Sequence, residues 1–128
     1  MADWNDVRQF ALALPETSER ESRGNVEWRV KDKLFVWERP LRKADLEELR
    51  DQAPEGPILG AMVADLGDKE ALLAEDPRVF FTTPHFNGYA AVLVRLERIP
   101  PAQLKLVVVE AWFARAPTRL SNDHLGRL

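Results

Sequence analysis

The chain has 128 residues, of which 45% are hydrophobic and 30% charged, the composition of a single globular domain. It contains no cysteine, which excludes disulfides, thiolate metal sites and cysteine nucleophiles. Eighteen basic and 21 acidic side chains give a net charge of −3, without the overall positive field of a typical nucleic-acid-binding protein. No apolar run approaches the roughly 18 residues of a membrane span, and the start, MADWNDVRQF, does not resemble a signal peptide. We therefore expect a soluble cytoplasmic protein that binds no membrane.

The first segment predicts an amphipathic helix. Apolar residues from Trp4 to Leu14 recur at steps of three and four, which places them on one helix face. Asp3 is the expected N-cap, because its carboxylate can accept a hydrogen bond from a free backbone N–H, and Pro15 ends the helix. The stripe could face a partner, but packing into the core is the favoured interpretation.

After a polar stretch, residues 16–25, that predicts a loop or a short edge strand, two segments with alternating apolar residues predict a β-hairpin. They span residues 26–30 and 33–39 and flank Lys31-Asp32, which we interpret as a two-residue turn. Such a turn places alternate side chains of both strands on one face, which becomes the core face. The expected pairs are Val30 with Lys33, Trp28 with Phe35, and Val26 with Trp37.

The rest of the chain alternates between helical and strand patterns. We expect a helical turn at 44–49, a buried strand at 58–64, a helix at 68–75, strands at 79–83 and 89–96, and a helix from Pro101 to Pro117. This order favours an α+β fold with a single antiparallel-rich sheet and helices packed on one side. We expect residues 1–116 to form one domain and residues 117–128 a polar, loosely held C-terminal tail.

The sequence carries no recognisable catalytic or cofactor motif. Its six glycines are scattered and form no phosphate-binding loop. His85 and His124 have no partner at a metal-binding spacing, and no serine lies in a nucleophile motif. We therefore expect a protein that is not an enzyme and that has neither a cofactor nor a metal site.

The most informative segment is residues 82–89 (TTPHFNGY), which concentrates polar and aromatic side chains at the break between two strands. His85 could contact a ligand or shuttle a proton, but a structural hydrogen bond within the turn is the favoured interpretation. A pocket between sheet and helices would be apolar with a few polar groups, as ligand sites are. The candidate ligand-binding residues are Trp37, Thr83, His85, Asn87, Tyr89 and Trp112.

Basic residues on and near the hairpin are candidates for phosphate contacts. They are Arg29, Lys31 and Lys33 on the hairpin, with Arg39, Arg42 and Lys43 at its far end, and acidic residues are interleaved with them. The hairpin aromatics Trp28, Phe35 and Trp37 could form a platform on which bases stack, but a place in the core is favoured.

Several segments, in this order and spacing, resemble the MmcQ/YjbR family of small bacterial domains. They are residues 13–17 (ALPET), 30–35 (VKDKLF), 80–89 (FFTTPHFNGY) and Ala111-Trp112. The resemblance covers roughly residues 4 to 116 and implies an α+β fold of the CyaY/frataxin-like type. It also implies a link to DNA, because the hairpins of this family look like a double-wing DNA-binding motif.

Two functions follow as hypotheses. The first is a non-enzymatic domain that binds nucleic acid (DNA) through the cationic hairpin tip, with a second contact from the 83–89 turn. The alternative is binding of a small molecule or peptide in the pocket between sheet and helices. We expect a monomer in either case.

Overall fold

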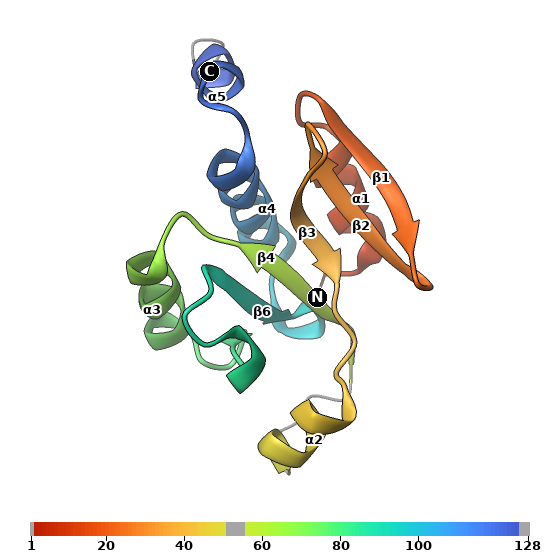
Figure 1. Cartoon of the computed structure of the whole chain (residues 1–128), viewed down its shortest axis with the longest axis vertical. Helices are drawn as coiled ribbons and strands as arrows, with labels where there is room; N and C mark the ends of the chain where they lie inside the picture. Colours follow the sequence, from red (N-terminus) through yellow and green to blue (C-terminus); the bar gives the residue numbers. More distant parts are fainter. Residues whose placement is uncertain (1, 51–55, 126–128) are drawn as a thin grey trace.

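The computed structural model describes residues 2–50 and 56–125, which fold around one antiparallel sheet (Figure 1). Within these residues the sheet has six strands in the order β1-β2-β3-β4-β6-β5. The strands are β1 (Thr17–Ser22), β2 (Asn25–Val30), β3 (Lys33–Glu38), β4 (Ile58–Met62), β5 (Phe80–Phe81) and β6 (Ala91–Arg95). The helices are α1 (Trp4–Leu12), α2 (Lys43–Leu49), α3 (Leu66–Glu75), α4 (Pro101–Arg115) and α5 (Thr118–Leu125), with 3₁₀ turns η2 (Pro84–Phe86) and η3 (Leu96–Arg98). The predicted α+β class and single antiparallel sheet are confirmed.

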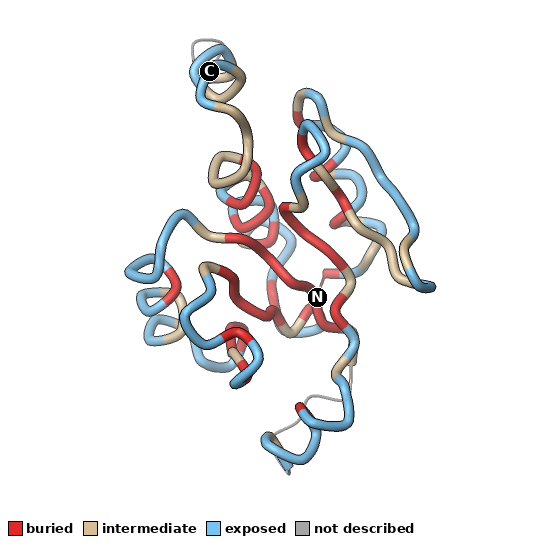
Figure 2. The backbone as a smooth tube through the Cα atoms, in the orientation of Figure 1, coloured by how far each residue is buried: buried red, intermediate tan, exposed pale blue. Residues whose placement is uncertain are grey.

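The main core lies between the sheet and the helices α1 and α4, which pack against each other. Figure 2 shows the buried backbone concentrated in the central strands and in α4. Burying one large aliphatic or aromatic side chain stabilises the fold by about 1.5–3 kcal/mol, so this layer supplies most of the driving force. Its fully buried members include Val7, Val30, Phe35, Val36, Leu59, Leu96, Ile99, Leu104, Val108 and Trp112.

Helix α1 begins as its sequence predicts. The Asp3 carboxylate accepts the backbone N–H of Asp6 at 2.9 Å, and the Asp6 carboxylate accepts the N–H of Asp3 at 3.1 Å. This reciprocal arrangement satisfies two backbone donors that the first turn leaves without partners. The predicted N-cap is confirmed.

The hairpin is present, but its predicted register is correct only next to the turn. Lys31 and Asp32 both have positive φ, 48° and 66°, as a type I′ turn requires, and Val30 pairs with Lys33. An irregularity between Trp28 and Arg29 then shifts the pairing. The predicted pairs of Trp28 with Phe35 and Val26 with Trp37 are therefore wrong. Trp28 pairs with Val36, and Glu27 pairs with Trp37.

The shift decides which hairpin side chains face the main core. An extra residue in one strand reverses the alternation beyond it. Phe35 and Val36 both join the main core as a result, whereas Trp37 turns to the opposite face of the sheet. There Trp37 lies over Gly60 of β4, where any Cβ atom would clash with the indole ring.

The opposite face of the sheet carries a second core, smaller than the main one. Leu34, Leu41 and Leu49 pack against its margin. The second core consists of Trp37, Ile58, Met62, Phe81, Phe86, Ala91 and Leu93.

Near the start of the chain the structure has the short edge strand that was one of the two predicted alternatives, and near its end it contains more regular structure than the pattern predicts. The polar stretch after α1 forms the edge strand β1, which pairs with β2 from Thr17↔Val30 to Ser22↔Asn25. The segment expected to be a loose tail forms α5, whose His124 ring lies 5.1 Å from the Trp112 ring. None of the described helices has the length and apolar character needed to span a membrane.

Candidate functional site

The segment from Thr83 to Tyr89 forms a compact turn that projects from the second core. Its backbone N–H groups bond inward: Phe86 to the carbonyl of Thr83 at 2.9 Å and Tyr89 to that of Phe86 at 3.0 Å. Gly88 has φ 75°, which a side chain would disfavour. Only Phe86 of the residues 84–89 is buried, so the turn is anchored by one ring and presents its other side chains to solvent.

A groove of about 440 Å³ lies between this turn and the end of β3. Four of the predicted ligand-binding residues, Trp37, His85, Asn87 and Tyr89, are brought together in its lining. The size falls within the roughly 300–1,000 Å³ of clefts that hold small molecules. The other lining residues are Leu34, Arg39, Arg42, Phe86 and Gly88.

The floor of the groove is aromatic. Phe86 lies at its centre, with ring centroids 6.4 Å from Trp37, 6.2 Å from Tyr89 and 5.0 Å from His85. The His85 ring meets the Phe86 ring edge-on, at 87°. Tyr89 is 48% exposed, so part of its side chain is accessible to a ligand.

Lys69 of α3 holds the turn in place. Its Nζ donates to the carbonyl oxygens of Phe86, at 2.6 Å, and Tyr89, at 2.9 Å. The residue is only 6% exposed and forms no ion pair with any described residue. Burial lowers the pKa of the Lys69 ammonium, and a neutral amine would still have two N–H donors for the two carbonyls.

A buried ion pair supports the opposite side of the groove. Arg39 Nη2 lies 3.1 Å from Asp45 Oδ2, and the two residues are 6% and 4% exposed. The Arg39 guanidinium also donates to the carbonyl of Pro40 and lies 5.3 Å from the Phe86 ring centroid. Burial alone would raise the pKa of Asp45, but the Arg42 backbone N–H and the Arg39 charge outweigh it and hold that pKa below its ordinary value.

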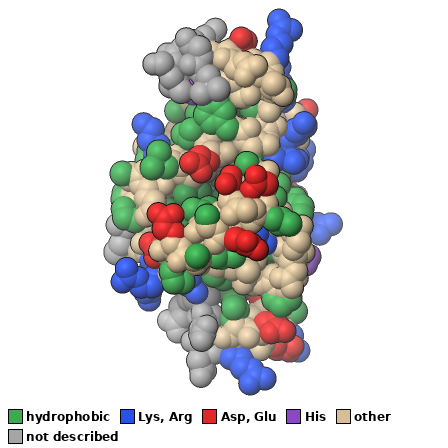
Figure 3. Space-filling model, turned by 90° about the vertical axis from the view of Figure 1, so that its left-hand side faces the viewer, with side chains coloured by type: hydrophobic (Ala, Val, Ile, Leu, Met, Phe, Trp, Pro, Cys, Tyr) green, Lys and Arg blue, Asp and Glu red, His purple; other side chains and the backbone are tan. Residues whose placement is uncertain are grey.

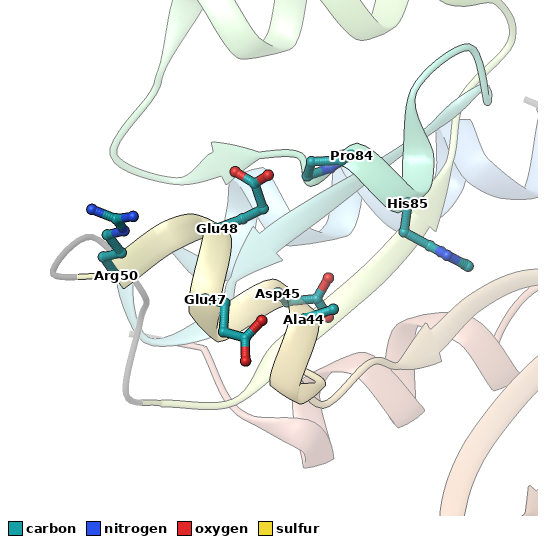
Figure 4. A pocket seen from close by; sticks show the side chains of 7 residues that line it. All are labelled: Ala44, Asp45, Glu47, Glu48, Arg50, Pro84 and His85. Atoms are coloured by element: carbon teal, nitrogen blue, oxygen red, sulfur yellow. The ribbon is translucent and has the colours of Figure 1, made fainter.

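A second and larger hollow, of about 890 Å³, adjoins the groove at His85 (Figure 4). Figure 4 shows its lining side chains coming from α2 on one side and from Pro84 and His85 on the other. Three carboxylates, those of Asp45, Glu47 and Glu48, line this hollow, whereas none lines the groove. His85 therefore lies between this hollow, which is lined by three carboxylates and Arg50, and the groove, which is lined by Arg39 and Arg42.

The remaining two predicted ligand-binding residues lie elsewhere. Trp112 is fully buried in the main core, where its Nε1 donates to the carbonyl of Pro15 at 3.0 Å, and it does not line the groove. Thr83 is buried behind the turn. Its Oγ1 has no hydrogen-bond partner among the described residues.

The predicted phosphate-contacting residues lie in two places: Arg29 reaches the hairpin turn, where its Nη1 donates to the carbonyl of Asp32 at 2.9 Å, whereas Arg39 and Arg42 line the groove. Arg29 pairs with Glu27 at 2.7 Å, and Lys31 lies 3.6 Å from Glu16. Lys33 is exposed beside the turn, and Arg39 is buried at the groove instead of standing at a hairpin tip. The stacking platform does not exist, because Trp28, Phe35 and Trp37 are all buried, as the core interpretation expects.

The sequence predicts Arg42 as a phosphate contact near the hairpin and not as part of a ligand groove, and it does not single out Phe86 or Lys69 individually as site residues. Phe86 lies in the informative segment 82–89, whereas Arg42 belongs to no motif, and only the fold brings the two together. Lys69 did leave a signal, because it lies three and four residues before Leu72 and Leu73, which pack against the main core. A lysine on the inward stripe of a short helix indicates a buried polar contact.

Comparison with known proteins identifies the family to which the chain belongs. A family model named YjbR matches residues 12–114, and the chain belongs to the YjbR family. The uncharacterized protein Rv2570 of Mycobacterium tuberculosis (strain ATCC 25618 / H37Rv) is 48% identical over 129 residues, covering 98% of both chains. The uncharacterized protein Mb2600 of Mycobacterium bovis matches to the same extent. The resemblance to the family is thus confirmed.

A solved structure supports the fold independently. The crystal structure of Deinococcus radiodurans protein DR2400, which carries the domain DUF419, matches with a TM-score of 0.68. The alignment covers 98% of this chain and 89% of that one at 18% sequence identity. At this identity the likeness concerns the fold alone.

Proposed function

We propose that this YjbR domain is a non-catalytic binding module that holds a small anionic molecule with a planar apolar part. The observation that carries the proposal is the groove beside β3, which combines an aromatic floor with Arg39, Arg42 and His85 and has no carboxylate in its lining. Ligand sites are commonly apolar clefts with a few placed polar groups, and this groove has that composition.

The charges around the groove favour an anion. The charge of Arg39 is shared with Asp45, so its guanidinium acts mainly as part of the wall. Arg42 is exposed and forms no ion pair with the described residues, which leaves its guanidinium able to bind a carboxylate or phosphate in two-pronged geometry. The Asn87 amide is exposed on the same rim and offers both a donor and an acceptor.

The exposed Tyr89 ring favours a planar group on the ligand. Flat rings stack on aromatic side chains with a gain of about 0.5–1.5 kcal/mol beyond the area that they bury. The Phe86 ring is held beneath it by the second core and by the Lys69 contact, so the stacking surface is preorganised.

A binding role is favoured over catalysis by the surroundings of His85. A histidine that acts as a general base is commonly oriented by a hydrogen bond to a carboxylate or carbonyl. Among the described residues His85 makes no such hydrogen bond, and its ring packs against the Phe86 ring with the centroids 5.0 Å apart. The His85 ring lines the groove, and no described residue makes the hydrogen bond that would orient it as a general base.

The proposal is tested by calorimetric titration and saturation-transfer NMR with indole-3-acetate, benzoate and adenosine monophosphate, and with benzylamine as a cationic control. We expect at least one anion to bind, and Arg42→Glu or Tyr89→Ala to weaken it about tenfold. Arg119→Glu, a charge reversal at an exposed residue of α5, should leave the affinity unchanged. Equal binding of benzylamine, or equal effects of Arg42→Glu and Arg119→Glu, would refute the proposal.

Nucleic-acid binding at the hairpin tip is the second candidate, because Lys31 and Lys33 are both exposed on either side of Asp32. Phosphate contacts there would give an affinity that falls steeply with salt. Fluorescence anisotropy with a short DNA duplex at low salt tests this function. The candidate requires a loss of binding in Lys31→Glu/Lys33→Glu that the exposed control Lys105→Glu does not produce.

A further inference from the structure

A second groove, of about 440 Å³, lies between α3 and α4. Its apolar lining comes from both helices and from the segment after β4. Three carboxylates line it, and no basic side chain does. We call it the acidic groove. It is lined by Val63, Ala64, Asp68, Ala71, Leu72, Glu75, Glu110, Phe113 and Ala114.

Acidic side chains gather in the middle of the face that carries α3. Figure 3 shows acidic side chains gathered over the middle of this face with hydrophobic side chains between them. Lysine and arginine side chains lie mainly at the margins of the same view (Figure 3). The potential over the acidic groove is therefore set by carboxylates, and it would attract a cationic partner and repel an anionic one.

A structural role within the fold explains only one of the three carboxylates that line the acidic groove. Asp68 lies in the first turn of α3, where a negative charge is favourable. Glu75 lies at the opposite, negative end of the same helix, where a carboxylate is unfavourable by about 0.3–1 kcal/mol. Glu75 and Glu110 form no ion pair with the described residues. No group of three potential ligands that could hold a metal ion occurs among the described residues.

The apolar part of the groove continues along α4. Leu106 is 64% exposed and lies one turn before Glu110 and two turns before Phe113, so the three share one face of the helix. A large aliphatic side chain at that exposure, in line with a half-buried phenylalanine, extends the apolar stripe beyond the groove itself.

From this charge and shape we infer that the acidic groove docks a basic amphipathic helix of a partner protein. Such a helix would place aliphatic residues at spacings of three, four and seven over Leu72, Phe113 and Leu106, in the helix-in-groove mode. Lysine or arginine residues flanking that stripe would lie against Glu75 and Glu110. This site is separate from the aromatic groove beside β3, so the two can be occupied independently.

The test uses a fluorescein-labelled, 15-residue helical peptide with leucines on one stripe and lysines on both flanks. A control peptide carries glutamate in place of each lysine. We expect anisotropy to detect binding of the basic peptide alone, and Glu75→Lys/Glu110→Lys to weaken it at least tenfold. Phe113→Ser should weaken it as well without reversing a charge, which separates docking from general charge attraction.

A matched control reverses two exposed carboxylates outside the acidic groove, in Glu21→Lys/Glu47→Lys. This variant has the same net charge as the groove variant and should bind the peptide as the wild type does. Circular dichroism establishes that each variant is folded. The inference is overturned if both double variants lose binding equally, if Phe113→Ser has no effect, or if sedimentation shows a second copy of the chain occupying the groove.

Discussion

The two faces of the sheet differ in how they treat polar groups. The main core, beneath α1 and α4, consists of buried hydrophobic residues throughout. The buried polar and charged residues among those described are Arg39, Asp45, Lys69 and Thr83, and they lie around the second core and its turn. Burying a charge is unfavourable unless the charge is paired. In this molecule the buried charges occur only around the second core and its turn, among the described residues.

This difference indicates which face serves stability and which serves recognition. The main core closes over its own apolar surface and leaves no polar group to interact with a partner. On the other face, Lys69 and the Arg39–Asp45 pair hold the turn and the end of β3 on either side of the aromatic groove. Polar contacts that fix a loop beside an apolar cleft are typical of a preorganised binding site.

The largest expected effect is a difference in the free energy of unfolding between a variant in the main core and a variant at the groove. Trp112→Ala removes a fully buried indole and its hydrogen bond to Pro15, and should lower the free energy of unfolding by about 3–5 kcal/mol. His85→Ala, at the exposed rim of the groove, should change it by less than about 0.5 kcal/mol. Urea denaturation followed by circular dichroism measures both. Similar losses in the two variants would remove the distinction between the faces.

Gly60→Ala probes the contact between β4 and the groove floor. The added methyl group would clash with the Trp37 indole, so the ring must move. Overpacking of this kind should cost about 1–3 kcal/mol in the free energy of unfolding. Because Trp37 lines the groove, the same variant should shift the NMR signals of Tyr89 and Phe86. Unchanged signals there would show that the ring moves away without touching the site.

Asp45→Asn tests the buried ion pair. At pH 7 it should lower the free energy of unfolding by about 1–2 kcal/mol, because Arg39 loses a charged partner. The pKa of Asp45 lies below its ordinary value of 3.8, so the unfolded chain binds more protons between the two values. The difference in the free energy of unfolding between the wild type and Asp45→Asn is therefore at its full value above about pH 5. It should shrink as the pH falls through the pKa that Asp45 has in the folded protein. A constant difference down to pH 2 would contradict this assignment.

Lys69→Met should have the smallest effect on stability, about 1 kcal/mol, because the lost hydrogen bonds are partly offset by removing a buried charge. Hydrogen exchange at residues 86–89 should nevertheless accelerate. Burial lowers the pKa of Lys69 below 10.5, so the unfolded chain binds the extra proton between the two values. The stability of the wild type relative to the variant should rise with pH over that interval. A fall in that difference would show that Lys69 gains, and does not lose, affinity for its proton on folding.

Much of the fold could be predicted because most helices and strands have a characteristic spacing of apolar residues and end at a proline or a turn. The helix after Asp3, the turn at Lys31-Asp32 and the helix before Pro117 are all present in the structure. The bulge in the hairpin could not be predicted, because a single extra residue leaves no trace in an alternating pattern. Its effect is large, since it moves Trp37 from the expected core to the floor of the groove.

The candidate site was predictable only where its residues lie in one segment. His85, Asn87 and Tyr89 could be grouped because they are neighbours in the chain. The placement of Arg42 depends on where the chain leaves β3, which no local pattern encodes. Trp112 was grouped with them as an aromatic residue, but its position on the buried stripe of α4 directs it to the main core.

The most direct test of the account is a ¹⁵N-resolved NMR titration of the full chain with indole-3-acetate. We expect the perturbed amides to lie at residues 34–42 and 83–90, around the groove, and the hairpin turn at Lys31-Asp32 to remain unperturbed. Perturbations confined to the hairpin turn, or spread evenly over the surface, would contradict the claim that the groove beside β3 is the binding site.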